Sequence, residues 1–81
     1  MKSEDIAAAI RTRLPSAEAR VSSADGTHFQ AVVIAREFGG MRPLERHRLV
    51  HDALGGRMGN EIHALSFETY TPEEWAARQS G

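Results

Sequence analysis

The chain has 81 residues, ten of them Lys or Arg and eleven Asp or Glu, so its formal net charge at pH 7 is −1. A chain this short builds only one modest hydrophobic core, which predicts a single domain over residues 1–81 and excludes a separate cofactor domain. Cysteine is absent, which excludes disulfide bonds, a thiolate nucleophile and cysteine ligation of a metal by this chain alone. The small net charge argues against strong non-specific attraction to nucleic acid.

The first residues are not typical of a targeting segment. Acidic residues occur by position 4 and no continuous apolar run follows them, unlike in a secretory signal or a transit peptide. No stretch approaches the ~20 apolar residues that span a bilayer. We therefore expect a soluble, cytoplasmic protein that has no membrane partner.

The first half of the chain predicts a helix followed by a hairpin. Ser3 can cap a helix whose apolar residues fall on one face, and Pro15 ends that helix. Two strands, at residues 19–22 and 27–36, then flank an Asp-Gly pair at positions 25–26, which is a common hairpin turn. The glycines and the proline that follow the second strand predict a loop.

Residues 43–58 predict a helical region with one apolar side. At 100° per residue, the side expected to face the core consists of Arg46, Leu49, Val50, Ala53 and Leu54. The opposite side consists of Leu44, His47, Arg48 and His51. Because Leu44 is out of phase with the other leucines, we expect a short first helical turn followed by a change of direction.

The last part of the chain predicts a strand and a short helix. Residues 61–70 are typical of a strand, and the helix begins with a capping box in which Thr71 is the cap and Glu74 follows three residues later. The predicted order is α-β-β-α-α-β-α. This is an α/β (α+β) fold in which a three-stranded sheet carries helices packed on one face.

Two histidines lie in the predicted strands. Strand alternation puts His63 on the same face as Leu65 and Phe67, at the rim of the core. It could satisfy a buried carbonyl group, or it could direct one imidazole nitrogen outward as a metal ligand. His28, at the start of the longer hairpin strand, has the same two alternatives, with the turn backbone as its hydrogen-bond partner.

The other two histidines, His47 and His51, stand four residues apart on one helix face. That spacing can present two nitrogens to a metal, but no further ligand of the usual type is adjacent. A solvated face is the simpler interpretation. Together with three arginines, the two histidines form a local basic patch that could contact phosphate groups: Arg42, Arg46, Arg48, His47 and His51.

An ordinary charged surface is the alternative to a nucleic-acid patch, because the acidic residues Glu45 and Asp52 are interleaved with the basic ones.

Motifs of enzymes are absent from the sequence. It has no glycine-rich phosphate loop, no G-x-S-x-G and no H-E-x-x-H, and Glu73 and Glu74 are explained by capping of a helix. We therefore do not expect an enzyme.

Taken in order, two long segments resemble the BolA family. They are "THFQAVVIAREFGGMRPLERHRLVHDAL" and "IHALSFETYTPEEW". Their ordered motifs extend to Trp75 and are most similar to those of the short bacterial branch. The resemblance implies a class II KH-like fold without the Gly-x-x-Gly nucleotide clamp of true KH domains.

The resemblance also implies a function. BolA proteins pair with monothiol glutaredoxins and share a [2Fe-2S] cluster, whose other ligands are the glutaredoxin cysteine and glutathione. The implied role is a non-enzymatic adaptor in iron-sulfur cluster maturation or trafficking, or in iron regulation. The isolated chain is then expected to be a monomer without a cofactor.

The cluster ligand of the family is matched here by His63. Its second ligand, in the hairpin turn, is matched by Asp25. Because a carboxylate is a hard donor that suits iron-sulfur iron poorly, His28 is a nearby substitute. An alternative function is also implied, since family members are described as DNA-binding transcription regulators linked to the stress response, through the helical region that here holds Arg42, Arg46, His47 and Arg48.

Overall fold

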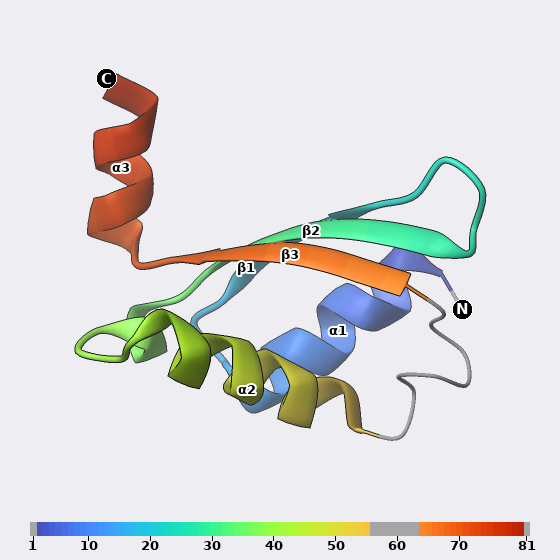
Figure 1. Cartoon of the computed structure of the whole chain (residues 1–81), viewed down its shortest axis with the longest axis horizontal. Helices are drawn as coiled ribbons and strands as arrows, with labels where there is room; N and C mark the ends of the chain where they lie inside the picture. Colours follow the sequence, from blue (N-terminus) through green and yellow to red (C-terminus); the bar gives the residue numbers. More distant parts are fainter. Residues whose placement is uncertain (1, 56–63, 81) are drawn as a thin grey trace.

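The computed structural model describes residues 2–55 and 64–80. The described elements are α1 (Ser3–Arg13), β1 (Glu18–Ser22), β2 (His28–Ile34), the 3-10 helix η1 (Arg36–Phe38), α2 (Pro43–Leu54), β3 (Ala64–Tyr70) and α3 (Pro72–Ser80) (Figure 1). This confirms the predicted order, but the additional middle helix is η1, at residues that were predicted to end the strand and begin a loop, and it does not come from a division of residues 43–58.

The strands form one mixed sheet in the order β1-β2-β3. β1 and β2 pair antiparallel as the two arms of the predicted hairpin, with Ala19 opposite Val33. β2 and β3 pair in parallel, which places His28 opposite Ala64. Two parallel strands need a crossover connection, and α2 supplies it.

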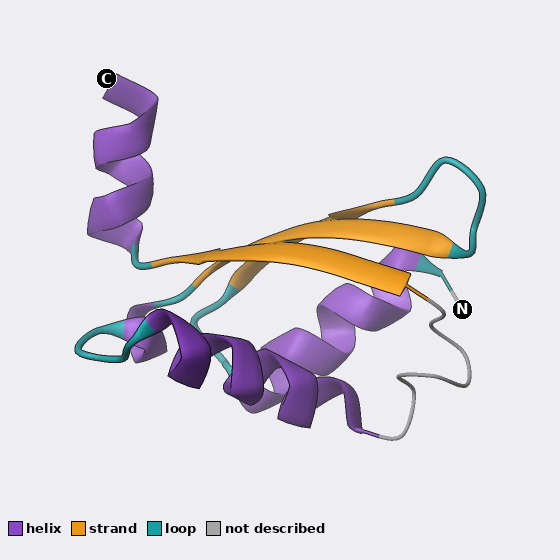
Figure 2. Cartoon of the chain, viewed as in Figure 1, coloured by secondary structure: helices purple, strands orange, loops and turns teal. Residues whose placement is uncertain are grey.

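One face of the sheet is covered by α1 and α2, and the other face is open (Figure 2). Side chains of β2 alternate accordingly: Phe29, Ala31 and Val33 are buried, whereas His28 and Gln30 are exposed on the open side. The predicted packing of helices on one face is confirmed for α1 and α2. α3 instead rises from the end of β3 on the open side (Figure 1).

The hydrophobic core lies between the helices and the covered face of the sheet. Each of its large side chains stabilises the fold by about 1.5 to 3 kcal/mol through burial. The largest fully buried side chains are Phe38, Ile6, Ile10, Leu14, Leu54, Val33 and Val50.

α2 is one continuous helix, and the predicted change of direction after Leu44 is wrong. Leu44 is out of phase because its side chain stays in solvent, with 61% of its surface exposed. The first turn is stabilised by Glu45, whose carboxylate accepts a 2.8 Å hydrogen bond from the backbone N–H of Arg42. The rest of the predicted phase is confirmed, since Val50 and Leu54 are buried.

The predicted capping box of α3 is confirmed. The hydroxyl of Thr71 accepts a hydrogen bond from the Glu74 N–H at 3.2 Å, and the Glu74 carboxylate accepts one from the Thr71 N–H at 2.7 Å. The predicted cap of α1 is wrong by one residue. Lys2 precedes the helix, and its N–H donates to the carboxylate of Asp5 at 3.1 Å, whereas Ser3 is already helical.

α2 ends at Leu54 and β3 begins at Ala64. The predicted continuations of these two elements, over residues 56–58 and 61–63, lie outside the described residues. In the part of the chain that the structure describes, no helix is both long enough and apolar enough to cross a membrane.

Candidate functional site

The turn between β1 and β2 brings the two candidate ligands Asp25 and His28 into contact. Gly26 adopts a left-handed backbone conformation with φ of +76°, which lets the chain reverse here. One carboxylate oxygen of Asp25, Oδ2, then lies 2.8 Å from Nδ1 of His28. The other, Oδ1, accepts hydrogen bonds of 2.9 Å from the backbone N–H groups of Thr27 and His28. The turn therefore holds the imidazole through a carboxylate.

These hydrogen bonds give Asp25 and His28 different roles. The backbone N–H of His28, followed by its imidazole, holds the pKa of Asp25 well below its ordinary value. Because the ionised carboxylate can only accept a hydrogen bond, Nδ1 of His28 carries the proton. Nε2 is then left with a free lone pair that can bind a metal. Carboxylates orient histidine ligands in metal sites in this way. Since both oxygens of Asp25 are already engaged, the geometry favours His28 as the ligand.

His28 is also accessible to a partner, because 69% of its side chain is exposed. A surface hollow of about 430 Å³ lies beside the turn and is lined by Ser22, Ser23, Ala24, Asp25, His28 and Gln30. Residues 2–55 and 64–80 contain no group of three or more His, Cys, Asp or Glu side chains that could hold a metal ion. His63, the predicted cluster ligand, lies outside the described residues.

The structure removes Arg46 from the predicted basic surface. Its side chain is only 11% exposed, and its guanidinium makes an ion pair with Glu74 at 2.7 Å. It also donates to the carbonyl of Met41 at 3.0 Å and lies over the ring of Phe38, 5.8 Å from the centroid. Arg46 is thus a structural link between α2 and α3, because its charge is already neutralised inside the fold.

The remaining residues of the predicted basic surface lie in solvent on α2. The side chain of Arg42 is 88% exposed, and His47 and Arg48 are also exposed. The carboxylate of Glu45 is 3.6 Å from the Arg42 guanidinium, so part of the positive charge is offset. This is a smaller basic surface than the sequence predicted.

His47 and His51 share an aromatic contact that the sequence analysis missed. Both rings pack against Phe67 of β3, with centroid separations of 4.5 and 5.6 Å. Helical phase placed the two histidines side by side. It could not show that Phe67, on the edge strand β3, packs against both of their rings. The pair therefore has a packing role as well as exposure to solvent.

A cluster of aromatic rings and arginines joins α3 to the sheet. The rings of Tyr70 and Trp75 have centroids 5.2 Å apart. Arg20 of β1 lies over Trp75 at 5.3 Å, and Arg78 lies over both rings. The contact between Arg20 and Trp75 could not be predicted from the sequence, because the two residues lie far apart in the chain and no helix or strand period relates them.

Comparisons with known proteins identify relatives. The family model described as "BolA-like protein" matches residues 8–74. The DNA-binding transcriptional regulator BolA of Vibrio cholerae is 47% identical over 49 residues, covering 60% of this chain and 46% of the relative. The acid stress protein IbaG of Escherichia coli is 35% identical over 77 residues, covering 94% of this chain and 90% of the relative. A solved BolA protein homologue from Coxiella burnetii has a TM-score of 0.82 at 45% identity, covering 94% of this chain and 97% of the other.

The alignment to the Vibrio cholerae regulator spans about half of that protein's length. These relatives are named as a transcriptional regulator and a stress protein rather than as enzymes. The family match covers most of the chain, and the similarity to the solved homologue extends over nearly all of it. The chain therefore belongs to the family of BolA-like proteins.

Proposed function

We propose that this chain is a non-enzymatic adaptor that pairs with a monothiol glutaredoxin and shares a [2Fe-2S] cluster with it, in cluster maturation or trafficking or in iron regulation. The proposal extends what the resemblance to the BolA family implies. The cysteine of the glutaredoxin and a glutathione would complete the ligand set. The observation that carries it is the hydrogen bond between Asp25 and His28, which fixes an exposed imidazole with Nε2 directed away from the carboxylate.

Within this proposal, His63 and His28 are the ligands from this chain, and Asp25 orients His28 without touching iron. The register of the sheet pairs His28 with Ala64, the residue that follows His63 in the sequence, although strand alternation expects the side chains of His28 and His63 on opposite faces. Imidazole is a suitable donor for this group, because histidine replaces cysteine at one iron of some [2Fe-2S] centres. When bound, the cluster supplies transferable iron and sulfide or an electron-accepting centre. The chain itself supplies imidazole nitrogens, and the carboxylate of Asp25 orients the ring of His28.

The test is co-purification of the chain with a monothiol glutaredoxin in the presence of iron, sulfide and glutathione. A stable complex with the visible absorption of a [2Fe-2S] cluster supports the adaptor. Glutaredoxin incubated alone under the same conditions is the control for cluster that does not need this chain. Absence of a complex at micromolar concentrations of both proteins would rule out the adaptor function.

A second candidate function is transcriptional regulation through DNA. It is favoured by the Vibrio cholerae relative, which is named a DNA-binding transcriptional regulator, and by the exposure of Arg42, His47 and Arg48 on α2. Binding of this kind should weaken as salt rises, by an amount set by the number of phosphates contacted. The double substitution Arg42→Glu with Arg48→Glu should abolish binding to duplex DNA at physiological salt. Unchanged affinity would show that α2 does not contact the DNA.

A further inference from the structure

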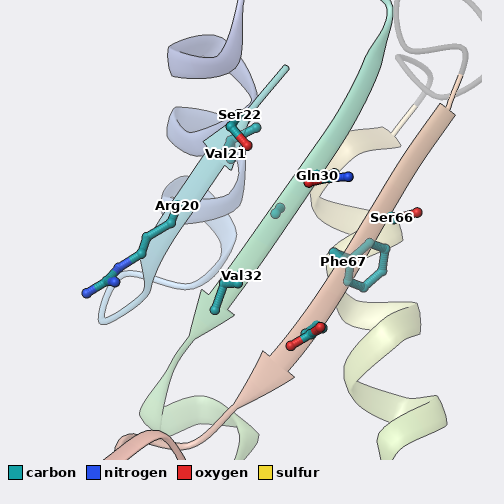
Figure 3. Close-up of a pocket in the computed structure, with 9 residues that line it drawn as sticks. Arg20, Val21, Ser22, Gln30, Val32, Ser66 and Phe67 are labelled. Atoms are coloured by element: carbon teal, nitrogen blue, oxygen red, sulfur yellow. The ribbon is translucent and has the colours of Figure 1, made fainter. Parts of the chain in front are cut away.

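In the part of the chain that the structure describes, no strand lies beside the outer edge of β3. Figure 3 shows Ser66 and Phe67 on this outermost strand, with β2 on one side only. Arg20 of β1 lies over the Trp75 ring, so α3 leans toward the opposite edge of the sheet. An open strand edge carries backbone donors and acceptors that can pair with another chain.

The backbone groups that face this edge belong to three residues. The carbonyl of Tyr70 accepts a 2.9 Å hydrogen bond from the N–H of Ala35, directly after β2, so the backbone of Tyr70 points toward β2. Successive residues of a strand point their N–H and C=O groups to opposite sides. Those of Leu65, Phe67 and Thr69 therefore point outward, and within the described residues they have no hydrogen-bond partner.

The two edges of the sheet differ in how they are protected against pairing. β3 has seven residues, contains no proline or glycine and carries one charged side chain, Glu68. β1 has five residues, with Arg20 at its centre. If β1 paired with a copy of itself about that centre, two Arg20 side chains would lie opposite each other, which opposes association. β3 is therefore the edge that is open to pairing.

We propose that two copies of this chain associate through β3, as an antiparallel pair whose two-fold axis passes between the two Phe67 residues. Phe67 is the centre of β3, so this register overlaps the whole strand. It places Leu65 opposite Thr69 of the second copy, and these residues all have outward backbone groups, as a hydrogen-bonded antiparallel pair requires. The two three-stranded sheets become one. The isolated chain is then a dimer, in place of the expected monomer.

The charges of β3 complement a copy of the same strand in this register. Ser66 lies opposite Glu68 of the second copy, so no like charges meet and the hydroxyl can donate to the carboxylate. An axis at Glu68 would instead put two carboxylates opposite each other. The Arg78 guanidinium, 3.9 Å from Glu68, offsets only part of that charge, because both side chains are 57% exposed. The strand is thus self-complementary, as a two-fold interface requires.

Phe67 adds an apolar contact at the axis. Its ring is half-buried, in contact with the rings of His47 and His51 on the covered side of the sheet. Residues directly opposite in an antiparallel pair have their side chains on the same face, and opposed aromatic side chains stabilise such pairs. The half-buried ring therefore loses contact with water when the two copies meet.

The first test uses the chain alone, without glutaredoxin or iron, because this contact does not depend on the proposed function. Sedimentation equilibrium over a range of protein concentrations should show monomer and dimer in exchange. Ser66→Glu puts a carboxylate opposite Glu68 at both symmetric positions, so it should raise the dissociation constant about tenfold. Ser66→Lys puts opposite charges there and should lower it.

Gln30→Glu is the matched control for the added charge. Gln30 is the neighbour of Ser66 in the register and is exposed on the same face, but it lies on the central strand. Its substitution should change the dissociation constant by less than about twofold, because solvent and salt screen a charge that is one strand further away. Thermal unfolding of each variant checks that it folds.

Disulfide formation tests the register, because the natural chain has no cysteine. Positions 66 and 68 of the two copies form a non-hydrogen-bonded pair with Cα atoms about 4.5 Å apart, which a disulfide can span. An oxidised mixture of Ser66→Cys and Glu68→Cys chains should therefore give a mixed disulfide dimer, identified by its mass. Either variant alone should not, because each position lies roughly 7–8 Å from its own copy.

Three results would overturn the proposal. One is that the chain remains a monomer at every concentration. Another is that Ser66→Glu and Gln30→Glu change the dissociation constant equally, which would place the contact on another surface. The third is that Ser66→Cys alone forms a disulfide dimer as readily as the mixture does, which would move the axis away from Phe67.

Discussion

Arg46 of α2 and Glu74 of α3 form a two-point ion pair, with Nη1 at 2.7 Å from Oε1 and Nη2 at 3.4 Å from Oε2. α2 packs on the covered face of the sheet, whereas α3 rises on the open side (Figure 1). Since Glu74 also closes the capping box with Thr71, one carboxylate starts α3 and joins it to α2. This pair helps to set the direction of α3 relative to the sheet.

Replacing Glu74 by alanine should destabilise the fold. The substitution removes a capping interaction and leaves the nearly buried Arg46 without its carboxylate, but 47% of the Glu74 side chain is in solvent, which screens the pair. We expect a loss of about 1 to 2 kcal/mol in the free energy of unfolding. Urea unfolding followed by Trp75 fluorescence measures it. Glu73→Ala, at the neighbouring exposed position, should cost less than about 0.5 kcal/mol. Equal losses in the two variants would contradict the role given to Glu74.

The same carboxylate predicts a dependence of stability on pH. Hydrogen bonds from the Arg46 guanidinium, and next from the Thr71 N–H, lower the pKa of Glu74 from 4.5 to about 2. A group with a depressed pKa in the folded state stabilises the fold above its unfolded pKa, and that stabilisation is lost as the pH falls. The stability difference between the wild-type chain and Glu74→Gln should therefore be constant near neutral pH and shrink between about pH 4.5 and 2. A difference that stays constant across this window would mean that the ion pair is not formed in solution.

Two leucines of α2 provide a matched test of the fold. Leu54 is fully buried in the core, whereas Leu44 is 61% exposed. Leu54→Ala should lower the free energy of unfolding by about 2 to 5 kcal/mol. Leu44→Ala should change it by less than about 0.5 kcal/mol. Chemical denaturation measures both, and similar losses would indicate that Leu44 is buried in the folded chain, contrary to its position in the structure.

Local signals in the sequence were enough to predict most of the fold. The Asp-Gly turn, the alternation in β2 and the capping box of Thr71 each depend on neighbouring residues, and each is confirmed. The predicted bend after Leu44 was wrong, because it was inferred only from the phase of Leu44 relative to the other leucines of the helix. An exposed leucine in the first turn of a helix costs little, so the helix did not need to bend.

The candidate site was less predictable, because its contacts join distant residues. The ion pair between Arg46 and Glu74 connects residues 28 positions apart. Helical phase did place Arg46 at the margin of the core face, and that signal conflicted with assigning it to a basic surface. The sequence placed Asp25 and His28 in one turn. Only the structure shows that the carboxylate of Asp25 bonds to the backbone N–H and to the ring of His28, and so orients that ring.

Asp25→Asn should remove the preference of the neutral His28 imidazole for carrying its proton on Nδ1. In the wild-type chain the carboxylate accepts from Nδ1, so the neutral imidazole should carry its proton there and leave Nε2 free. Long-range proton-nitrogen NMR of the ring distinguishes the two tautomers. We expect a predominantly Nδ1-protonated His28 in the wild-type chain and a mixture in Asp25→Asn. An unchanged tautomer ratio would show that Asp25 does not orient the ring.

His63 and His28 are proposed to be ligands of a cluster that this chain shares with a monothiol glutaredoxin. The most direct measurement is visible circular dichroism of the reconstituted complex, compared among the wild-type chain, His63→Ala, His28→Ala and the control His51→Ala. His51 is exposed on α2, where its ring packs on Phe67. Because it is not one of the proposed ligands, its substitution should leave the spectrum unchanged. We predict that His63→Ala abolishes the spectrum of the mixed complex, and that His28→Ala changes its shape and speeds cluster loss. Spectra of His63→Ala and His28→Ala that cannot be distinguished from the wild type would contradict the account.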